Sequence, residues 1–490
     1  MSSTAHFLNS ETNSLVDPQT FERESHNFLA WLKSNPGAHV SPKISLTDLR
    51  SSGAGRGVVA RTNIEEGEDL FSISRTTILS VQNSDLKTLL AADLDELGPW
   101  LSLMLVMIYE YLRGESSKWA PYFKVLPSHF DTLMFWSPAE LQELQASPVI
   151  EKIGKQGADE AIRDKILPIV RANPSQFPPL NSRESWEGEV AAHALLELAH
   201  MMGSLIMAYA FDIEKPEDDD EEEENGDDDG YMTDDEEQLP KGMVPLADLL
   251  NADAHRNNAR LFQEEEALVM KAIKPINLGE EIFNDYGELP RADLLRRYGY
   301  VTDNYKPFDV IELSSKEICQ AAGLENADVE SQPKLQLLEK FDILDDGYVI
   351  SRPAAENSIH DIFSTELVSL VTILTQTPSE FDVQKSKNRP PKPKMESAQI
   401  EVLQRALRTK AMYYPTSISE DEQILAQLPY VAEDASSRRK RMALQVRLGE
   451  KETLSAALSV LERHLAQVTE HRKRSASNGD ETRQAKMPRM

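Results

Sequence analysis

The sequence predicts an α+β protein with a β-rich core, a helical insert inside that core, and an all-α C-terminal domain. Two segments with the pattern of short strands and turns, residues 41–100 and 241–305, stand on either side of a long stretch with helical periodicity. From residue 306 onward the pattern is mainly helical. Strands at both ends of a helical insert, followed by a separate helical region, are typical of this class.

The N-terminal region, residues 1–40, is expected to contain a helix over Pro18–Ser34, where Phe21, Phe28, Leu29 and Leu32 fall on one helical stripe. The first part of the core follows at residues 41–100. Its expected strands are separated by the Gly-rich run SSGAGRG and by a turn at residues 65–67, and they cover Ile44–Leu46, Val58–Ala60 and Leu70–Ile73.

The helical insert is assigned to residues 101–213. Its expected helices cover Trp100–Leu112, Pro138–Ser147, Gly157–Ala172 and Trp186–Ala210. The first of these is the most apolar stretch and is too short to span a bilayer, so no membrane association is expected. Residues 214–240 are acidic and of low complexity, and they are expected to form a disordered loop.

The second part of the core, residues 241–305, has strand patterns between Ala259 and Ile282 and a helix over Arg291–Tyr298. The C-terminal domain, residues 306–470, is expected to be helical apart from the basic loop KSKNRPPKPK. It ends in a predicted helix pair over Ala432–Arg472 that is split near Gly449. Residues 471–490 are expected to be a basic, disordered tail.

Charge and cysteine content narrow the class of protein. The formal net charge is −30, and 15 acidic residues lie between Glu217 and Glu237. This balance argues against direct nucleic-acid binding and favours a basic protein partner, although solubility alone explains it equally well.

The single Cys319 excludes an intrachain disulfide and a multi-cysteine zinc site, so no metal is expected. The start, MSSTAHFLNSETNS, has no secretory pattern, and we expect an intracellular monomer.

The first candidate motif is the glycine turn Gly53-Ala54-Gly55-Arg56-Gly57, between two expected strands. Glycines allow a backbone to approach a ligand closely. The motif does not fit the dinucleotide fingerprint, because no helix follows it, and it lacks the GKS or GKT ending of a P-loop. Taken by itself, it is equally well explained as a tight turn without a ligand.

Two further motifs flank the second strand region. MVPLADLLNADAHRNNARL, residues 243–261, places Asp248 and Asn251 three residues apart. GEEIFNDYGELPRADLLRRYGYV, residues 279–301, places Tyr286 and Tyr298 each before a glycine, with a helix between them. Taken singly, Asn251 is better explained as a helix-ending residue and Tyr298 as a core aromatic.

The order of the three motifs resembles that of the SET-domain family, which has a GxG turn after the first strand, an Asn motif after the insert, and a strand that ends in a catalytic tyrosine. WAPYFKVLP (119–127), MFWSPAELQELQAS (134–147) and YYPTSISEDEQIL (413–425) look like the subgroup of the plant Rubisco large-subunit methyltransferase. The resemblance covers about residues 20–470 and implies a C-terminal substrate-binding domain. The segments LLNAD and LLRRYGYV are most similar to a fungal branch that acts on a large-subunit ribosomal protein.

The resemblance also implies roles for individual residues. The backbone of Ala54, Gly55, Arg56 and Gly57, together with Asn251 and Ala252, would hold S-adenosylmethionine. The family usually has His where this chain has Ala252, so a side-chain role at that position is in doubt. Tyr286 matches the catalytic tyrosine and also borders the cofactor, and Tyr298 matches the aromatic that closes the cofactor and substrate pocket. Phe211 and Asp248 match positions near the target lysine.

The implied chemistry explains these residue types. A sulfonium donor passes its methyl group to a lysine amine, which must first lose a proton although its ordinary pKa is about 10.4. An aromatic channel desolvates the ammonium and lowers its pKa, while the ring faces can hold the cation. Tyr286 would position the amine through its hydroxyl, and no covalent intermediate is required.

Three functions remain open from the sequence alone. The first is a lysine methyltransferase acting on a large-subunit ribosomal protein, and the second acts on a histone or another protein. Against a histone enzyme, the cysteine-rich zinc segments that often flank such cores are absent. The third is a non-catalytic acidic chaperone or scaffold for basic proteins. Two basic clusters, Arg438–Arg441 and His471–Arg474, predict residence in the nucleus, with the cytoplasm as a second location.

Overall fold

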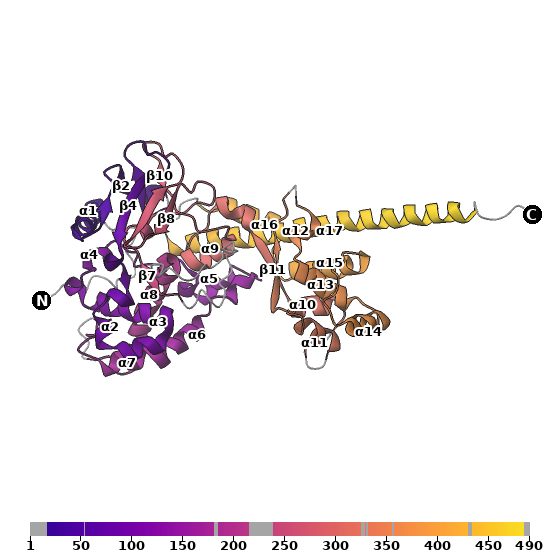
Figure 1. The fold of residues 1–490 in the computed structure, drawn as a ribbon, viewed down its shortest axis with the longest axis horizontal. Coiled ribbons are helices and arrows are strands. Elements are labelled where there is room, and N and C mark those ends of the chain that lie inside the picture. The colour runs from indigo at the N-terminus through magenta and orange to yellow at the C-terminus, as the bar shows by residue number, and fades with distance from the viewer. Residues whose placement is uncertain are drawn as a thin grey trace, which may run out of the picture.

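The computed structural model describes residues 17–52, 54–180, 185–214, 239–324, 329, 332–354, 357–429 and 434–484, with side chains as far as residue 470. The predicted acidic loop, residues 214–240, lies almost wholly outside the described residues. The β-rich core and its helical insert form one lobe, a mainly helical domain forms a second lobe, and the last helix runs through both (Figure 1). The predicted α+β class is confirmed.

Three antiparallel sheets build the first lobe. Their strand orders are β1-β4-β9-β8, β10-β3-β2 and β5-β7-β6. The strands are β1 (His39–Val40), β2 (Ile44–Asp48), β3 (Arg56–Ala60), β4 (Asp69–Ser74), β5 (Leu79–Ser80), β6 (Ala210–Asp212), β7 (Lys241–Met243), β8 (Ala259–Gln263), β9 (Ala267–Ala272) and β10 (Glu281–Ile282). Val58 of β3 pairs with Ile282 of β10, and Phe71 of β4 pairs with Met270 of β9. Strands from both ends of the insert therefore belong to one core.

Two long helices organise the packing of the insert. α3 (Ala91–Leu112) packs against α8 (Glu189–Tyr209), and both contribute many buried apolar side chains. By length and composition α8 could cross a membrane, although no membrane-spanning helix was expected from the sequence. However, 72% of its most apolar window is buried in the lobe, which is the behaviour of a core helix. The remaining helices between β5 and β6 include α2 (Leu86–Leu89) and α4 (Ala120–Phe123).

Two predicted helices of the insert are shorter or less regular than expected. α5 (Pro138–Gln142) stops before the predicted Ser147, because the backbone turns left-handed at Gln145, with φ of 55°. The helix expected over 157–172 consists of α6 (Lys155–Ala161), a π turn (Ile162–Ile166) and α7 (Leu167–Ala172). Pro168 has no N–H to continue the α-helical ladder, and the wider π turn accommodates it.

The second lobe is helical, but among its described residues it also contains a two-stranded sheet that the prediction of an all-α domain missed. β11 (Val310–Ser314) pairs with β12 (Gly347–Ser351), and Ile311, Leu313 and Ile350 point into the core. Its helices are α10 (Ser315–Ala321), α11 (Pro333–Glu339), α12 (Ile359–Ile362), α13 (Thr365–Leu374), α14 (Pro378–Lys387), α15 (Ser397–Met412) and α16 (Ile418–Gln427).

The last helix corrects two predictions. α17 (Ala435–Gln484) is continuous through Gly449, where a split was expected, and its backbone stays helical through most of the segment expected to be a disordered tail. Gly449 is needed for close packing, because a Cβ there would lie 2.1 Å from Asp309 Oδ2 and 2.5 Å from Arg291 Nη2. In the sequence this glycine suggested a break in the helix. In the structure the helix continues, and glycine is needed because a side chain would collide with a buried ion pair.

α17 connects the two lobes through apolar contacts on both sides of Gly449. Before it, Met442, Ala443 and Val446 pack in a cluster with Trp136 of the insert. After it, buried apolar side chains join the core of the second lobe, namely Leu454, Ala457 and Leu461. The helix is therefore part of the hydrophobic packing of each lobe.

Candidate active site

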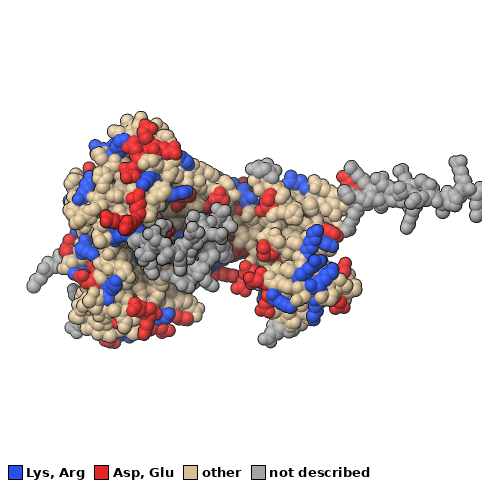
Figure 2. Space-filling view, viewed as in Figure 1, with Lys and Arg blue, Asp and Glu red and all other residues tan. Residues whose placement is uncertain are grey.

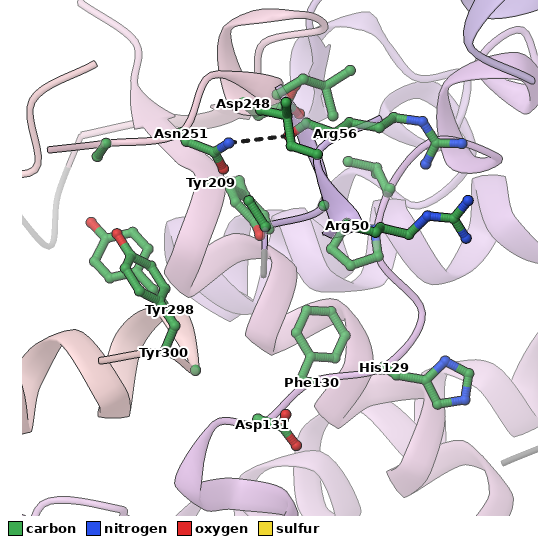
Figure 3. Close-up of a pocket in the computed structure, with 18 of the residues that line it drawn as sticks. Arg50, Arg56, His129, Phe130, Asp131, Tyr209, Asp248, Asn251, Tyr298 and Tyr300 are labelled. Carbon is green, nitrogen blue, oxygen red and sulfur yellow. Dashed lines mark hydrogen bonds between the residues drawn. The ribbon is translucent and has the colours of Figure 1, made fainter. Parts of the chain in front are cut away.

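A cavity of 1540 Å³ lies in the first lobe, between α1 (Pro18–Ser34), the glycine turn, the end of α8 and the start of α17. Figure 3 shows Tyr209, Asp248 and Asn251 close together in it, with Tyr298 and Tyr300 grouped on one side. The residues predicted from the sequence that line the cavity are Ala54, Gly55, Arg56, Asp248, Asn251, Ala252, Tyr286 and Tyr298. Gly57 and Phe211 are not among the lining residues.

The segments that carry these residues are held together by backbone pairing. Ala252 forms a parallel β-bridge with Asn284, and the Asn284 N–H donates to the Asn251 carbonyl at 2.9 Å. β10, which directly precedes this stretch, pairs with β3 of the glycine turn. The glycine turn, the Asn segment and the strand that leads to Tyr286 therefore meet at one edge of the core.

Asn251 links this junction through its side-chain amide. Its Nδ2 donates to Glu281 Oε1 at 2.7 Å and to the Arg56 carbonyl at 3.4 Å, the bond drawn in Figure 3. Gly57, predicted to contact the ligand, is closely packed in the structure. A Cβ at this position would lie 2.4 Å from Leu49 Cδ1 and 2.9 Å from Glu281 Oε1, so Gly57 permits the close packing of β3 against this network.

The glycine turn presents its backbone to the cavity. Arg56 directs its guanidinium away, toward the ring of Phe21 at 3.9 Å, and donates to Ser25 Oγ and the Val125 carbonyl. A Cβ on Gly55 would meet nothing within 4 Å, so this residue borders open space. An exposed peptide backbone beside an amide side chain suits a ligand that carries both an amino-acid group and a ribose, as S-adenosylmethionine does.

A cluster of tyrosines forms the inner wall. The rings of Tyr286 and Tyr298 stack at 4.0 Å with an interplanar angle of 8°, and Tyr300 packs edge-on against Tyr298. Burial raises the pKa of Tyr298 to about 12 and that of Tyr286 well above its usual value, so both phenols are neutral at physiological pH. Such a wall can hold a cation against ring faces while disfavouring a hydrated ammonium.

Asp248 is a buried carboxyl in the cavity wall. Burial raises its pKa to about 8, so the group is largely protonated at neutral pH. The Tyr122 hydroxyl donates to its Oδ2, whereas Oδ1 has no hydrogen-bond partner among the described residues. A neutral carboxyl does not form an ion pair with an ammonium, and it can donate one hydrogen bond into the cavity. Leu246, two residues earlier, is held at φ 81°, which indicates local backbone strain.

At the end of α8 the structure brings Tyr209 to the cavity and leaves the predicted Phe211 outside it. Phe211 lies on β6 and packs against the hydrophobic core of the first lobe, while Tyr209, two residues earlier, lines the cavity. Tyr300 was also missed, although it belongs to the same YGY sequence as Tyr298.

Among the residues that the structure describes, no group of three or more His, Cys, Asp or Glu side chains could hold a metal ion.

Two family descriptions match the chain. "SET domain" matches residues 55–287, which include the glycine turn, the Asn segment and Tyr286. "Rubisco LSMT substrate-binding" matches residues 325–454, which lie in the second lobe and the first part of α17. The two matched regions together cover well over half of the chain.

Known proteins are similar to much of the chain. The chain is 37% identical over 308 residues to ribosomal lysine N-methyltransferase 4 of Saccharomyces cerevisiae, a match that covers 61% of this chain and only 60% of that relative. It is 28% identical to N-lysine methyltransferase setd6 of Xenopus laevis over 88% of this chain and 94% of that protein. The solved structure of Rubisco LSMT bound to AdoMet shares the fold, with a TM-score of 0.64, 19% identity, and coverage of 91% of this chain and 93% of that one.

Proposed function

We propose that the chain is a protein-lysine N-methyltransferase of the SET-domain type and that it methylates a lysine of a large-subunit ribosomal protein. The observation that carries the enzymatic part is the cavity in which the glycine turn, Asn251, neutral Asp248 and the Tyr286–Tyr298 stack meet. The substrate part is supported by the relative named ribosomal lysine N-methyltransferase 4.

The residues of the cavity divide into two groups. The backbone of Ala54–Arg56, with Asn251 and Ala252, would hold S-adenosylmethionine, which supplies an electrophilic methyl group when bound. Tyr286, Tyr298 and Tyr300 would surround the lysine side chain, exclude water and lower the pKa of its amine. Because Asp248 is neutral, it would not trap the amine as an ammonium ion in an ion pair.

Tyr286 is the residue that we propose orients the amine. It stacks on Tyr298, which fixes the plane of its ring, and burial keeps its hydroxyl protonated. A fixed phenol O–H at the end of a desolvated channel holds the amine in line with the transferred group. Alignment and electrostatics would then supply most of the rate enhancement.

The choice of a ribosomal substrate also agrees with charge. The chain carries a net charge of −30, and ribosomal proteins of the large subunit are small, basic and rich in lysine. Opposite charge speeds the encounter of enzyme and substrate. A histone or another non-ribosomal protein is the second candidate, supported by the relatives named N-lysine methyltransferase.

Intact-mass spectrometry of ribosomal proteins tests the proposal. We expect one large-subunit protein from cells that lack this enzyme to be lighter by a whole number of methyl groups than in the parent strain. Re-expression of the parent chain should restore the mass, and re-expression of Tyr286→Phe should not. If every ribosomal protein keeps its mass while another protein loses methylation, the ribosomal substrate is wrong and the second candidate takes its place.

We also propose residence in the nucleus. Of the two basic clusters, the first is engaged within the fold: Arg439 donates to Asp131 at 2.9 Å and forms a further ion pair with Glu140. The proposal therefore depends on His471–Arg474, a segment whose side chains lie outside the described residues. A fluorescent fusion in which Arg472, Lys473 and Arg474 are replaced by alanine should move to the cytoplasm, and unchanged nuclear signal would contradict this assignment.

A further inference from the structure

Five basic side chains are concentrated at the C-terminal end of α14 and on the loop that follows it in the second lobe. Residues 383–395 contain no acidic residue, and their basic residues are all exposed, namely Lys385, Lys387, Arg389, Lys392 and Lys394. We call these five residues the basic loop cluster. Figure 2 shows a group of Lys and Arg side chains on the face of this lobe, in a protein whose net charge is strongly negative.

None of the five members of the basic loop cluster forms an ion pair with a described residue. Some other cations of the lobe are neutralised, as in the pairs Lys410–Glu317 at 3.2 Å and Arg408–Glu462 at 3.1 Å. An excess of unpaired positive charge on one surface creates a local potential that favours an anionic partner.

The loop is also held in a fixed conformation. Gln384 Nε2 donates to the Arg389 carbonyl at 2.7 Å, and the Lys394 N–H donates to Thr372 Oγ1 at 3.1 Å. Pro391 and Met395 are buried in the lobe. Buried and exposed residues therefore alternate, and the charged side chains project from a pre-ordered backbone, which reduces the entropy lost on binding.

We propose that the basic loop cluster binds the phosphate backbone of RNA next to the methylated protein. This proposal rests on the ribosomal substrate proposed above. The cluster lies within residues 325–454, the region that matches a substrate-binding domain, yet a basic surface repels a basic ribosomal protein. The polyanion that such a protein accompanies is ribosomal RNA, and Lys and Arg contacts to phosphates supply sequence-independent affinity.

The composition of the surface favours RNA over an acidic protein. Between residues 384 and 395, all of which are described, no large apolar side chain is exposed; the nearest is Val383. Protein interfaces are enriched in aromatic residues and depleted in lysine, whereas this surface has four lysines, one arginine and no aromatic residue. The expectation from overall charge that the chain binds no nucleic acid is therefore reversed for this one surface.

The proposal is tested by replacing all five residues with glutamine in the full-length protein. A matched control replaces four lysines and one arginine that are exposed elsewhere, namely Lys33, Arg61, Lys87, Lys165 and Lys316. Binding is measured by fluorescence anisotropy with a labelled RNA duplex of mixed sequence between 50 and 200 mM KCl. If all five cations contact phosphates, the affinity of the parent should fall about 500-fold over this range.

We expect the five-residue variant to lose at least about tenfold in affinity at 50 mM KCl and most of the salt dependence, while the control retains both. Equal RNA affinity of the variant and the parent would overturn the proposal. So would binding of polyglutamate as tight as that of RNA, because the surface would then be one for acidic proteins.

Methylation assays separate this proposal from the proposed function. With the ribosomal protein identified by mass, the variant should methylate the free protein at the parent rate but show a raised KM for RNA-containing subunits. An equal KM for subunits would overturn the role of the cluster. If neither substrate is methylated by the parent while the variant still loses RNA affinity, the RNA surface stands and the ribosomal substrate fails.

Discussion

Replacement of Gly449 by alanine tests how α17 is packed against the two lobes. The new Cβ would stand 2.1 Å from Asp309 Oδ2 and 2.5 Å from Arg291 Nη2. Because a Cβ is fixed by its own backbone, it cannot move away unless the helix backbone also moves. These two groups form a buried ion pair at 2.7 Å, with side chains 5% and 3% exposed. Alanine must therefore displace a carboxylate that is paired inside the protein.

The magnitude follows from two opposing effects. Alanine stabilises a helix interior by about 1 kcal/mol relative to glycine. Disruption of a buried ion pair costs about 3–5 kcal/mol. The net expectation is a loss of about 2–4 kcal/mol. Because Arg291 begins α9 (Arg291–Tyr298), whose last residue stacks on Tyr286, we also expect lower methyl-transfer activity.

The assay is urea unfolding followed by circular dichroism, with the midpoint and slope compared among variants. Gly157→Ala on α6 is the matched control, because its Cβ would meet nothing within 4 Å and should stabilise the protein slightly. A Gly449→Ala protein that is as stable as its parent, with unchanged activity, would refute the reasoning.

Three further predictions concern the cavity and the acidic segment. Tyr286→Phe is expected to leave cofactor affinity within a few-fold of the parent, measured by calorimetry, and to slow methyl transfer by at least about 100-fold, since its hydroxyl acts mainly at the transition state; full activity would remove it from the mechanism. Burial raises the pKa of Asp248 to about 8, above its unfolded value of about 3.9, so the folded protein binds the extra proton between these values and loses stability as pH rises through them. Asp248→Asn should flatten that slope of the urea midpoint against pH, and an unchanged slope would contradict a buried neutral carboxyl. Deletion of residues 217–237 removes 15 acidic residues and should leave melting temperature and cofactor affinity unchanged while raising the KM of a basic substrate at low salt; a lower melting temperature would show a structural role.

Elements with strong local signals were predictable from the sequence. α1 begins after Asp17, whose carboxylate caps the helix, and the predicted bounds agree with the structure. α9 ends before Gly299, which adopts φ 77° and terminates the helix. The short apolar runs of β3 and β4, bounded by turns, also predicted strands correctly.

Features that depend on contacts between distant segments were not predictable. Tyr122 and Asp248 are 126 residues apart, and their hydrogen bond exists only because α4 and the Asn segment meet in the folded lobe. Gly449 has the local signal of a helix break, and its close approach to Asp309 is visible only in three dimensions. Tyr209 lines the cavity and Phe211 does not, because of the direction in which the chain leaves the core at the end of α8. A single sequence does not specify that direction.

The path of α17 has a consequence for how the protein is made. Trp136 and Leu295 of the first lobe, and the apolar core of the second, each need side chains from residues 442–461 to complete their packing. During synthesis, at a rate of about 5–20 residues per second, these residues leave the ribosome after the other residues of both cores. Both lobes must therefore wait with an unfilled apolar groove until residues 442–461 have emerged. We expect nascent chains that lack this segment to be bound by chaperones, and methyl transfer to begin only after the segment has packed.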